Sequence, residues 1–169
     1  IRMGPRLSGT EEFLYALPRF AVAGADAYKP GLERMDLIME RMGRPERAFS
    51  SIHVAGTNGK GSTASVIAAI YSSAGGKTGL DTSPHLLHVS ERMRIDGRPA
   101  SIDWLEKTVQ RYSGLFRETG ASFFEVTTAV SFLYFAQHAV NLAVVEAGLG
   151  GRHDATNVLR PALSVITGV

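Results

Sequence analysis

The chain has 169 residues, about the length of one domain, and 44% of them are hydrophobic while 20% are charged. This composition is typical of a soluble globular domain with one sizeable core. The net charge of +2 is too small to indicate nucleic acid binding, and the absence of cysteine excludes disulfides and thiolate metal sites. Polar residues interrupt the most apolar stretch, 126–145, and no leader-like apolar run is visible, so we expect a cytoplasmic protein without membrane partners.

Two stretches near the start of the chain have helical periodicity. The first covers residues 9–20, and in the second, 31–42, apolar side chains recur at spacings of three and four. Gly43 is a plausible C-cap of the second helix, and Pro45 prevents its continuation. A segment of small, turn-forming residues, 23–31, separates the two helices.

Strand and helix patterns alternate through the middle of the chain. A short β-type run, 52–55, leads directly into the letters GTNGKGST and then into a helix-forming stretch, 64–74, that ends at two glycines. Residues 78–82 form a second strand candidate. Residues 91–95, followed by Asp-Gly, indicate a hairpin or a strand end.

The last third of the chain completes an alternating pattern. Ser101 is a plausible cap for a helix whose apolar face runs to Phe116, and another helix is predicted over 124–138. Residues 142–146 and 163–167 are continuous apolar runs, as buried parallel strands require. Strands that alternate with helices of this length predict an α/β fold, with a mostly parallel sheet flanked by helices.

The segment 56–63 has the composition and the setting of a phosphate loop. Its glycines let backbone N–H groups turn inward on an anion, and the following helix adds its positive end. Lys60 would reach the β- and γ-phosphates, and a hydroxyl from Ser62 or Thr63 could meet Mg²⁺. Because Lys60 is followed by Gly61, the generic spacing is not met strictly, and a glycine-rich turn without a ligand is the alternative. The residues predicted to bind the ATP phosphates are Gly56, Thr57, Asn58, Gly59, Lys60, Gly61, Ser62 and Thr63.

Longer stretches resemble the motifs of a known family, in that family's order. These stretches are IHVAGTNGKGST at 52–63, DTSPHL at 81–86 followed by SERMRIDG at 90–97, FFEVTT at 123–128, and EAGLGGRHDATN at 146–157. Together they resemble the folylpolyglutamate and dihydrofolate synthases, the folate branch of the Mur ligase superfamily. The resemblance covers nearly all of the chain, from about residue 32 onward.

The resemblance implies both a fold and an activity. It makes residues 1–169 the N-terminal ATP-binding domain of a Mur ligase-like enzyme, truncated before its C-terminal end and without the glutamate-binding domain. In that family ATP phosphorylates the carboxylate of dihydropteroate or folate, and the amine of L-glutamate then attacks the acyl phosphate. We expect small-molecule substrates only, a monomeric full-length enzyme, and no amide formation by this chain alone. The alternatives are a cell-wall Mur peptide ligase and a non-catalytic nucleotide-binding fragment.

A metal site is predicted beside the phosphate loop. Glu146 ends an apolar strand, and ligands of parallel sheets bind at the carboxyl ends of the strands. Since Mg²⁺ prefers oxygen ligands together with phosphates, we interpret Glu146 as a metal ligand that acts with Lys60 in catalysis. The resemblance implies that Ser83 offers a second oxygen. The alternatives are that Glu146 caps the following turn and that Ser83 only initiates the turn before Pro84.

A pterin site is predicted from the same motifs. A flat heteroaromatic ring needs one stacking face and a few polar edges, and we assign these to Phe124 and Asp154. Core packing is the alternative for Phe124, and ordering of the loop is the alternative for Arg152 and Asp154. The pair His85 and His88 is weak evidence for a metal site and is interpreted as loop structure or substrate wall, whereas the other histidines are interpreted as structural. The predicted substrate residues are Ser83, Pro84, His85, Phe124, Arg152 and Asp154.

Overall fold

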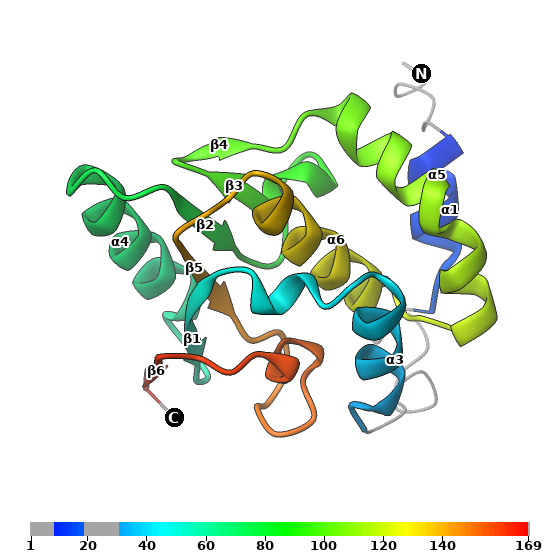
Figure 1. The fold of residues 1–169 in the computed structure, drawn as a ribbon. Coiled ribbons are helices and arrows are strands. Elements are labelled where there is room, and N and C mark those ends of the chain that lie inside the picture. Colours follow the sequence, from blue (N-terminus) through cyan, green and yellow to red (C-terminus); the bar gives the residue numbers. More distant parts are fainter. Residues whose placement is uncertain (1–8, 19–30, 169) are drawn as a thin grey trace, which may run out of the picture.

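The computed structural model describes residues 9–18 and 31–168 of the protein. A six-stranded sheet forms its centre (Figure 1). Its strand order is β4-β3-β2-β5-β1-β6. The four parallel strands are β2 (Thr78–Asp81), β5 (Leu142–Glu146), β1 (Ser50–Ala55) and β6 (Leu163–Ile166). The two antiparallel strands at one edge are β3 (Met93–Ile95) and β4 (Arg98–Pro99). The predicted α/β fold with a mostly parallel sheet is therefore confirmed.

Helices cover both faces of the sheet. Helix α4 (Lys60–Ser73) packs on one face against β5, β2 and β1, and α6 (Phe123–Gln137) packs on the other. Successive residues of a strand point to opposite faces, and β5 serves both layers in this way. Val144 belongs to the small cluster under α4, while its neighbours on either side belong to the large core around α6.

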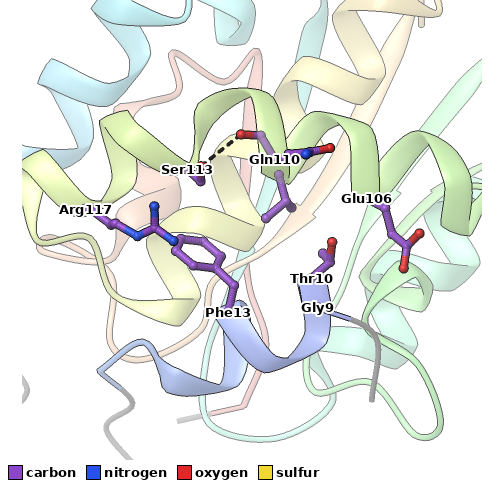
Figure 2. A pocket seen from close by; sticks show the side chains of 8 residues that line it. Gly9, Thr10, Phe13, Glu106, Gln110, Ser113 and Arg117 are labelled. Carbon is purple, nitrogen blue, oxygen red and sulfur yellow. Dashed lines mark hydrogen bonds between the residues drawn. The ribbon is translucent and has the colours of Figure 1, made fainter. Parts of the chain in front are cut away.

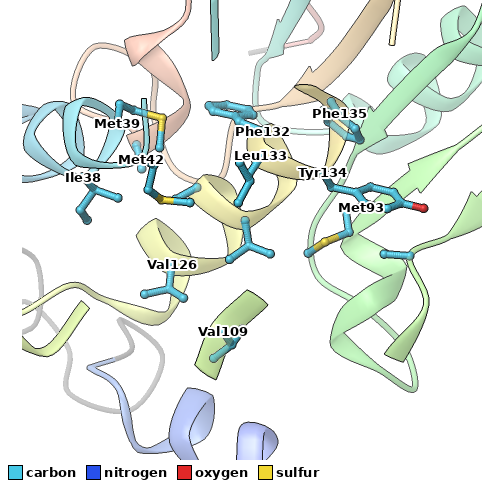
Figure 3. Close-up of a cluster of buried hydrophobic side chains, with 14 of the residues drawn as sticks. Ile38, Met39, Met42, Met93, Val109, Val126, Phe132, Leu133, Tyr134 and Phe135 are labelled. Atoms are coloured by element: carbon cyan, nitrogen blue, oxygen red, sulfur yellow. The ribbon is translucent and has the colours of Figure 1, made fainter. Parts of the chain in front are cut away.

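The large core is built around α6, because twelve of its fifteen residues are buried. A helix that is apolar on all sides must be surrounded by other elements. It is enclosed by the sheet, α1 (Gly9–Ala16), α3 (Glu33–Arg41) and α5 (Ile102–Thr119). Figure 3 shows side chains of α3 and its C-terminal end, among them Met39 and Met42, meeting those of α6.

Most of the predicted elements are present with small shifts at their ends. The strand β6, predicted to be buried, instead lies at the edge of the sheet, with Leu163 and Ile166 55% and 73% exposed. Ser101 caps α5 by accepting the Trp104 N–H at 3.1 Å, as predicted. Asp96 and Gly97 have φ values of 48° and 77°, as expected for the two central residues of a tight hairpin turn between β3 and β4. Gly43 follows α3 with a φ of 85°, which is the left-handed conformation of a helix stop.

Some features differ from the prediction or lie beyond it. Helix α4 begins at Lys60 rather than at residue 64, so residues 60–63 of the predicted phosphate loop form its first turn. Three short 3-10 turns were not predicted, namely η2 (Pro45–Arg47), η3 (Val89–Arg92) and η4 (Ala155–Val158). Residues 19–20 of the first predicted helix and nearly all of the segment 23–31 lie outside the described residues. In the described part of the chain, no helix is long and apolar enough to cross a membrane.

Candidate functional site

The phosphate loop, residues 56–63, runs from the end of β1 through the first turn of α4, so the predicted strand–loop–helix setting is confirmed. Gly56 has a φ of 134°, and a Cβ placed there would lie 2.1 Å from Oγ1 of Thr167. Only glycine fits such a position. The N–H of Thr57 donates to the carbonyl of Gly168 at 3.0 Å, which attaches the loop to the segment after β6.

The first turn of α4 presents donors to the space above the loop. The first intrahelical bond runs from the Thr63 N–H to the Gly59 carbonyl at 2.9 Å. The N–H groups of residues 60–62 precede that bond and have no partner within the helix. The Lys60 ammonium donates to the Thr57 carbonyl at 3.2 Å, so the side chain folds back over the loop. Together these groups form a positive site suited to an anion.

The Glu146 carboxylate lies against this first turn. A Cβ at Gly61 would be 3.2 Å from its Oε2 and 3.6 Å from its Oε1. The N–H of Ser83 donates to Oε2 at 2.9 Å. Glu146 itself is only 7% exposed. The end of β5, the segment after β2 and the phosphate loop therefore meet at this acid. The Oε1 atom has no hydrogen-bond partner among the described residues, which fits a carboxylate oxygen that could face a hard cation.

The β2–β3 loop, residues 82–92, is held by one carboxylate. Glu91 accepts the N–H groups of Leu86, Leu87 and His88 at 3.0, 3.0 and 2.9 Å. These bonds lower the pKa of Glu91, and the bond from Leu86 has the largest effect. The carboxylate bonds only to backbone groups here, and the residues Leu86 and Leu87 are 88% and 90% exposed.

His85 lies between two polar side chains within this loop. Its Nδ1 accepts from Nε of Arg92 at 2.9 Å, and its Nε2 is 3.3 Å from the Tyr15 hydroxyl. The neighbouring His88 instead uses its Nδ1 to accept from the N–H of Ser90 at 3.1 Å. The two rings therefore bond to different groups of the protein, which favours the loop-structure interpretation over a histidine metal pair. No cluster of three or more metal-ligating side chains occurs within 9–18 and 31–168.

Asp81, the last residue of β2, is a buried acid that the sequence interpretation missed. Burial raises its pKa well above the usual value, while the charge of Arg92 and a 3.3 Å hydrogen bond from Ser131 act in the opposite direction. Burial lowers the pKa of Arg92, whereas the charges of Asp81 and Glu146 raise it. An acid at the end of a strand, as at Glu146, was the pattern that could have identified it.

The glycine-rich loop, residues 148–154, follows Glu146 at the same edge of the sheet. A Cβ at Gly148 would lie 2.4 Å from Cζ of Phe124, so the ring of Phe124 packs on the loop. Asp154 is only 4% exposed, and its Oδ2 accepts the Leu149 N–H at 2.7 Å. These contacts favour the loop-ordering alternative for Asp154. The side chain of Arg152 is exposed, and its backbone carbonyl accepts from Asn157 at 3.1 Å.

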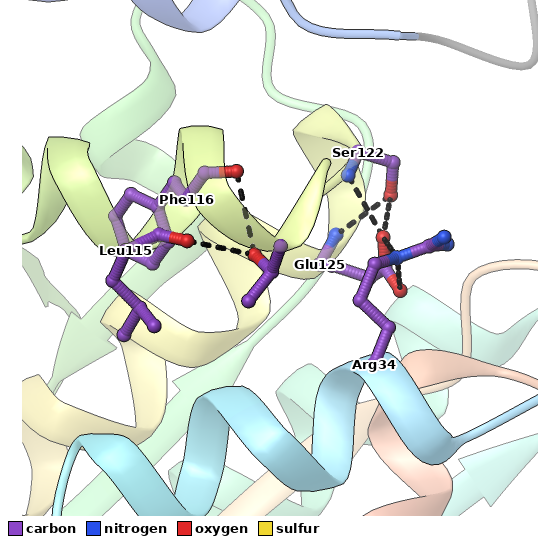
Figure 4. A network of polar contacts seen from close by, with 6 residues as sticks. Arg34, Leu115, Phe116, Ser122 and Glu125 are labelled. Carbon is purple, nitrogen blue, oxygen red and sulfur yellow. Dashed lines mark hydrogen bonds and ion pairs between the residues drawn. The ribbon is translucent and has the colours of Figure 1, made fainter.

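The start of α6 is fixed by an ion pair rather than left open for a ligand. Arg34 of α3 donates its Nε to both oxygens of Glu125, at 2.8 and 2.9 Å (Figure 4). Glu125 also accepts the Ser122 N–H at 2.8 Å, which completes a capping box. The acid of the FFEVTT stretch therefore has a structural role next to Phe124.

A separate pocket lies between α1 and α5 (Figure 2). Eight described residues line it, including Phe13, Glu106, Gln110 and Arg117. The Arg117 guanidinium lies 5.0 Å over the Phe13 ring. None of the predicted site residues lines this pocket, so the predicted site and the pocket are distinct.

Comparison with known proteins agrees with the resemblance seen in the motifs. No family model matches the chain. It is 43% identical over 148 residues to a dihydrofolate synthase/folylpolyglutamate synthase of Bacillus subtilis, which covers 83% of this chain and 34% of that protein. The chain thus spans about a third of the length of the curated relatives it matches.

Solved structures show the same relationship. A folylpolyglutamate synthase from Thermotoga maritima superposes with a TM-score of 0.80 at 42% identity, over 84% of this chain and 35% of that one. The Mycobacterium tuberculosis folylpolyglutamate synthase complexed with ADP and AMPPCP superposes with a TM-score of 0.78 at 41% identity, over 81% and 33%. The chain is therefore similar, in sequence and in fold, to the folylpolyglutamate and dihydrofolate synthases, and the similarity spans about a third of the length of such a protein.

Proposed function

We propose that this chain is the ATP-binding part of a ligase that joins L-glutamate to the carboxylate of dihydropteroate or folate. The observation that carries the proposal is the Glu146 carboxylate, placed against Gly61 in the first turn of the phosphate-binding helix. An anion cradle and a carboxylate side by side are what a magnesium nucleotide requires. The names of the relatives, and the nucleotides bound in a related structure, support the same choice.

The residues of the chain have distinct roles in this proposal. The N–H groups of residues 60–62 and the Lys60 ammonium would stabilise negative charge on the transferred phosphoryl group. Glu146 would hold Mg²⁺, together with the hydroxyl of Ser83 or Ser62 and the phosphates. The bound ion would supply neutralising charge at the phosphate oxygens.

The proposed reaction has two steps. The γ-phosphoryl group of ATP moves to a carboxylate oxygen of the pterin substrate, which gives an acyl phosphate and ADP. The glutamate amine then attacks the acyl carbon, loses a proton and expels phosphate as the amide forms. We assign the pterin wall to Ser83, Pro84, His85 and Phe124, with Arg152 at its exposed side.

The proposal also assigns nucleotide binding and glutamate binding to different parts of the full protein. The relatives are about three times as long as the matched segment, so we assign glutamate binding to parts of the protein outside this chain. Amide formation is then expected only from the full-length enzyme, which we expect to be a cytoplasmic monomer. Binding of magnesium ATP is the activity to measure in this chain.

A titration of the chain with magnesium ATP tests the nucleotide site. Lys60→Ala is expected to weaken binding by about 10- to 150-fold, the loss typical of a charge-assisted contact of about 1.5–3 kcal/mol. Ser73→Ala is the matched control, because Ser73 is an exposed residue at the far end of the same helix. Equal effects of the two substitutions, or no binding by the unaltered chain, would contradict a phosphate loop.

Phosphate release by the full-length enzyme tests the ligase activity. Dihydropteroate or tetrahydrofolate, each with glutamate, is expected to stimulate release of phosphate from ATP. The assignment fails if neither acceptor has this effect.

A further inference from the structure

A buried chain of hydrogen bonds runs from β1 to the glycine-rich loop. His53 of β1 is 7% exposed, and its Nε2 lies 2.7 Å from Oγ1 of Thr156, which is fully buried. The Thr156 hydroxyl in turn bonds to Oδ1 of Asp154, and Oδ2 of Asp154 accepts the N–H of Leu149. Residues 103 positions apart in the sequence are thereby connected.

The direction of these bonds follows from the number of protons. The Thr156 hydroxyl has one proton, which it donates to the Asp154 carboxylate. Its oxygen must therefore accept from His53, so the proton of the imidazole resides on Nε2. Burial lowers the pKa of His53, against the opposing charge of Asp154, and this favours a neutral ring.

The two ends of this hydrogen-bond chain lie close in sequence to two loops of the candidate site. His53 precedes Gly56, the first residue of the phosphate loop, by three positions in β1. Leu149 follows Glu146 by the same number of positions, in the loop on which Phe124 packs. The sheet register pairs His53 with Val145, directly before Glu146. The hydrogen-bond chain therefore spans the base of the site.

We propose that His53 is a positioning residue, whose Nε2–H acts through Thr156 and Asp154 to hold the glycine-rich loop in place beside the phosphate loop. The loop's contribution to ligand binding rests on the proposed function, whereas the holding of the loop does not. A glutamine at position 53 can present an amide N–H close to where Nε2 lies, but a leucine cannot.

Amide hydrogen exchange of the ligand-free chain tests the proposal. His53→Leu is expected to speed exchange at the Leu149 N–H by about tenfold. The Thr156 hydroxyl then loses the donor that orients it toward Asp154, and of the fixed bonds to Oδ1 only the Thr156 backbone N–H, at 3.0 Å, remains. His53→Gln is expected to restore slow exchange. The Val144 N–H, in the centre of the sheet, serves as the reference and is expected to be unchanged.

A second pair of variants covers the case in which His53→Leu unfolds the chain. Thr156→Val removes the hydroxyl at nearly constant volume, and Thr156→Ser keeps it. The valine variant should speed exchange at Leu149 about tenfold, while the serine variant should not. Equal exchange at Leu149 in the unaltered chain and in the leucine and valine variants overturns the proposal.

The same measurement separates this proposal from the proposed function. Lys60→Ala is expected to leave exchange at Leu149 unchanged, because Lys60 bonds to the Thr57 carbonyl and not to the hydrogen-bond chain. If magnesium ATP fails to bind but His53→Leu still speeds exchange at Leu149, the ligase assignment is wrong and the positioning role stands. If magnesium ATP binds but exchange at Leu149 does not respond to the leucine and valine variants, the positioning role is wrong and the ligase assignment stands.

Discussion

Replacing Gly61 by alanine separates stability from metal binding, because metal binding should weaken while stability changes little. Gly61 is the second residue of α4, and no positive φ is required there. In a helix interior alanine is more favourable than glycine by about 1 kcal/mol, which is an upper bound for a position in the first turn. The new methyl group would, however, lie 3.2 Å from Oε2 of Glu146. The carboxylate must then move by a few tenths of an ångström and lengthen its bond to the Ser83 N–H.

The magnitudes follow from this displacement. We expect the strain to cancel most of the gain in helix stability, so that the melting temperature changes by less than about 2–4 °C, the shift that corresponds to 1 kcal/mol in a chain of this size. Mg²⁺ binds its oxygen ligands within a narrow range near 2.0–2.1 Å. A shift of a few tenths of an ångström should therefore weaken magnesium-dependent ATP binding by about tenfold, or about 1.4 kcal/mol.

Calorimetric titration with ATP, in the presence and absence of magnesium, measures the effect. Gly114→Ala in α5 is the matched control, because Gly114 is also helical and a Cβ placed there would point into open space. That control should raise the melting temperature by about 2–4 °C and leave ATP binding unchanged. Unweakened binding of magnesium ATP by Gly61→Ala would refute the placement of Glu146 beside the metal. An equal loss without magnesium would indicate a clash with the phosphates instead.

Two further predictions concern Glu146 and His53. Glu146→Gln should remove the magnesium dependence of ATP binding, while the melting temperature stays within about 2–4 °C because the amide oxygen can still accept the Ser83 N–H; a variant that retains the magnesium dependence would contradict the metal role. Burial lowers the pKa of His53 in the folded state below the value of about 6.5 that it has in the unfolded chain. The stabilising contribution of the neutral ring is therefore fully present above about pH 6.5 and is lost as the pH falls toward the folded-state pKa. Urea unfolding at several pH values should show this loss, and His53→Gln should flatten it; identical pH dependence in both proteins would count against a buried neutral ring.

The local features of the site could be predicted from the sequence. A β-type run, glycines and a helix-forming run follow one another at residues 52–74, so the phosphate loop needs no information from distant residues. The place of Glu146 followed from a general rule, since the carboxyl ends of parallel strands meet at one edge. The same rule applied to Asp81 would have indicated a second acid, but no local pattern connects it to Ser131, which donates to it, or to Arg92, whose charge acts on it.

The long-range polar contacts could not be predicted in this way. The partner of His53 lies 103 residues further along the chain, and nothing near His53 in the sequence identifies Thr156. Asp154 also caps η4 by accepting the Thr156 N–H at 3.0 Å. This local bond was easier to predict, because aspartate is a common residue at the start of a helical turn. The roles of the other predicted substrate residues stay predictions.

The hydrogen bonds to Glu91 make the shape of the β2–β3 loop independent of the side chains at its tip. Three consecutive backbone N–H groups bond to one carboxylate, so the conformation is set by main-chain atoms. The two leucines at the tip add almost no buried surface to it. Relatives could therefore exchange these side chains to suit different molecules while the scaffold beneath stays the same, as long as the acid that organises it is kept.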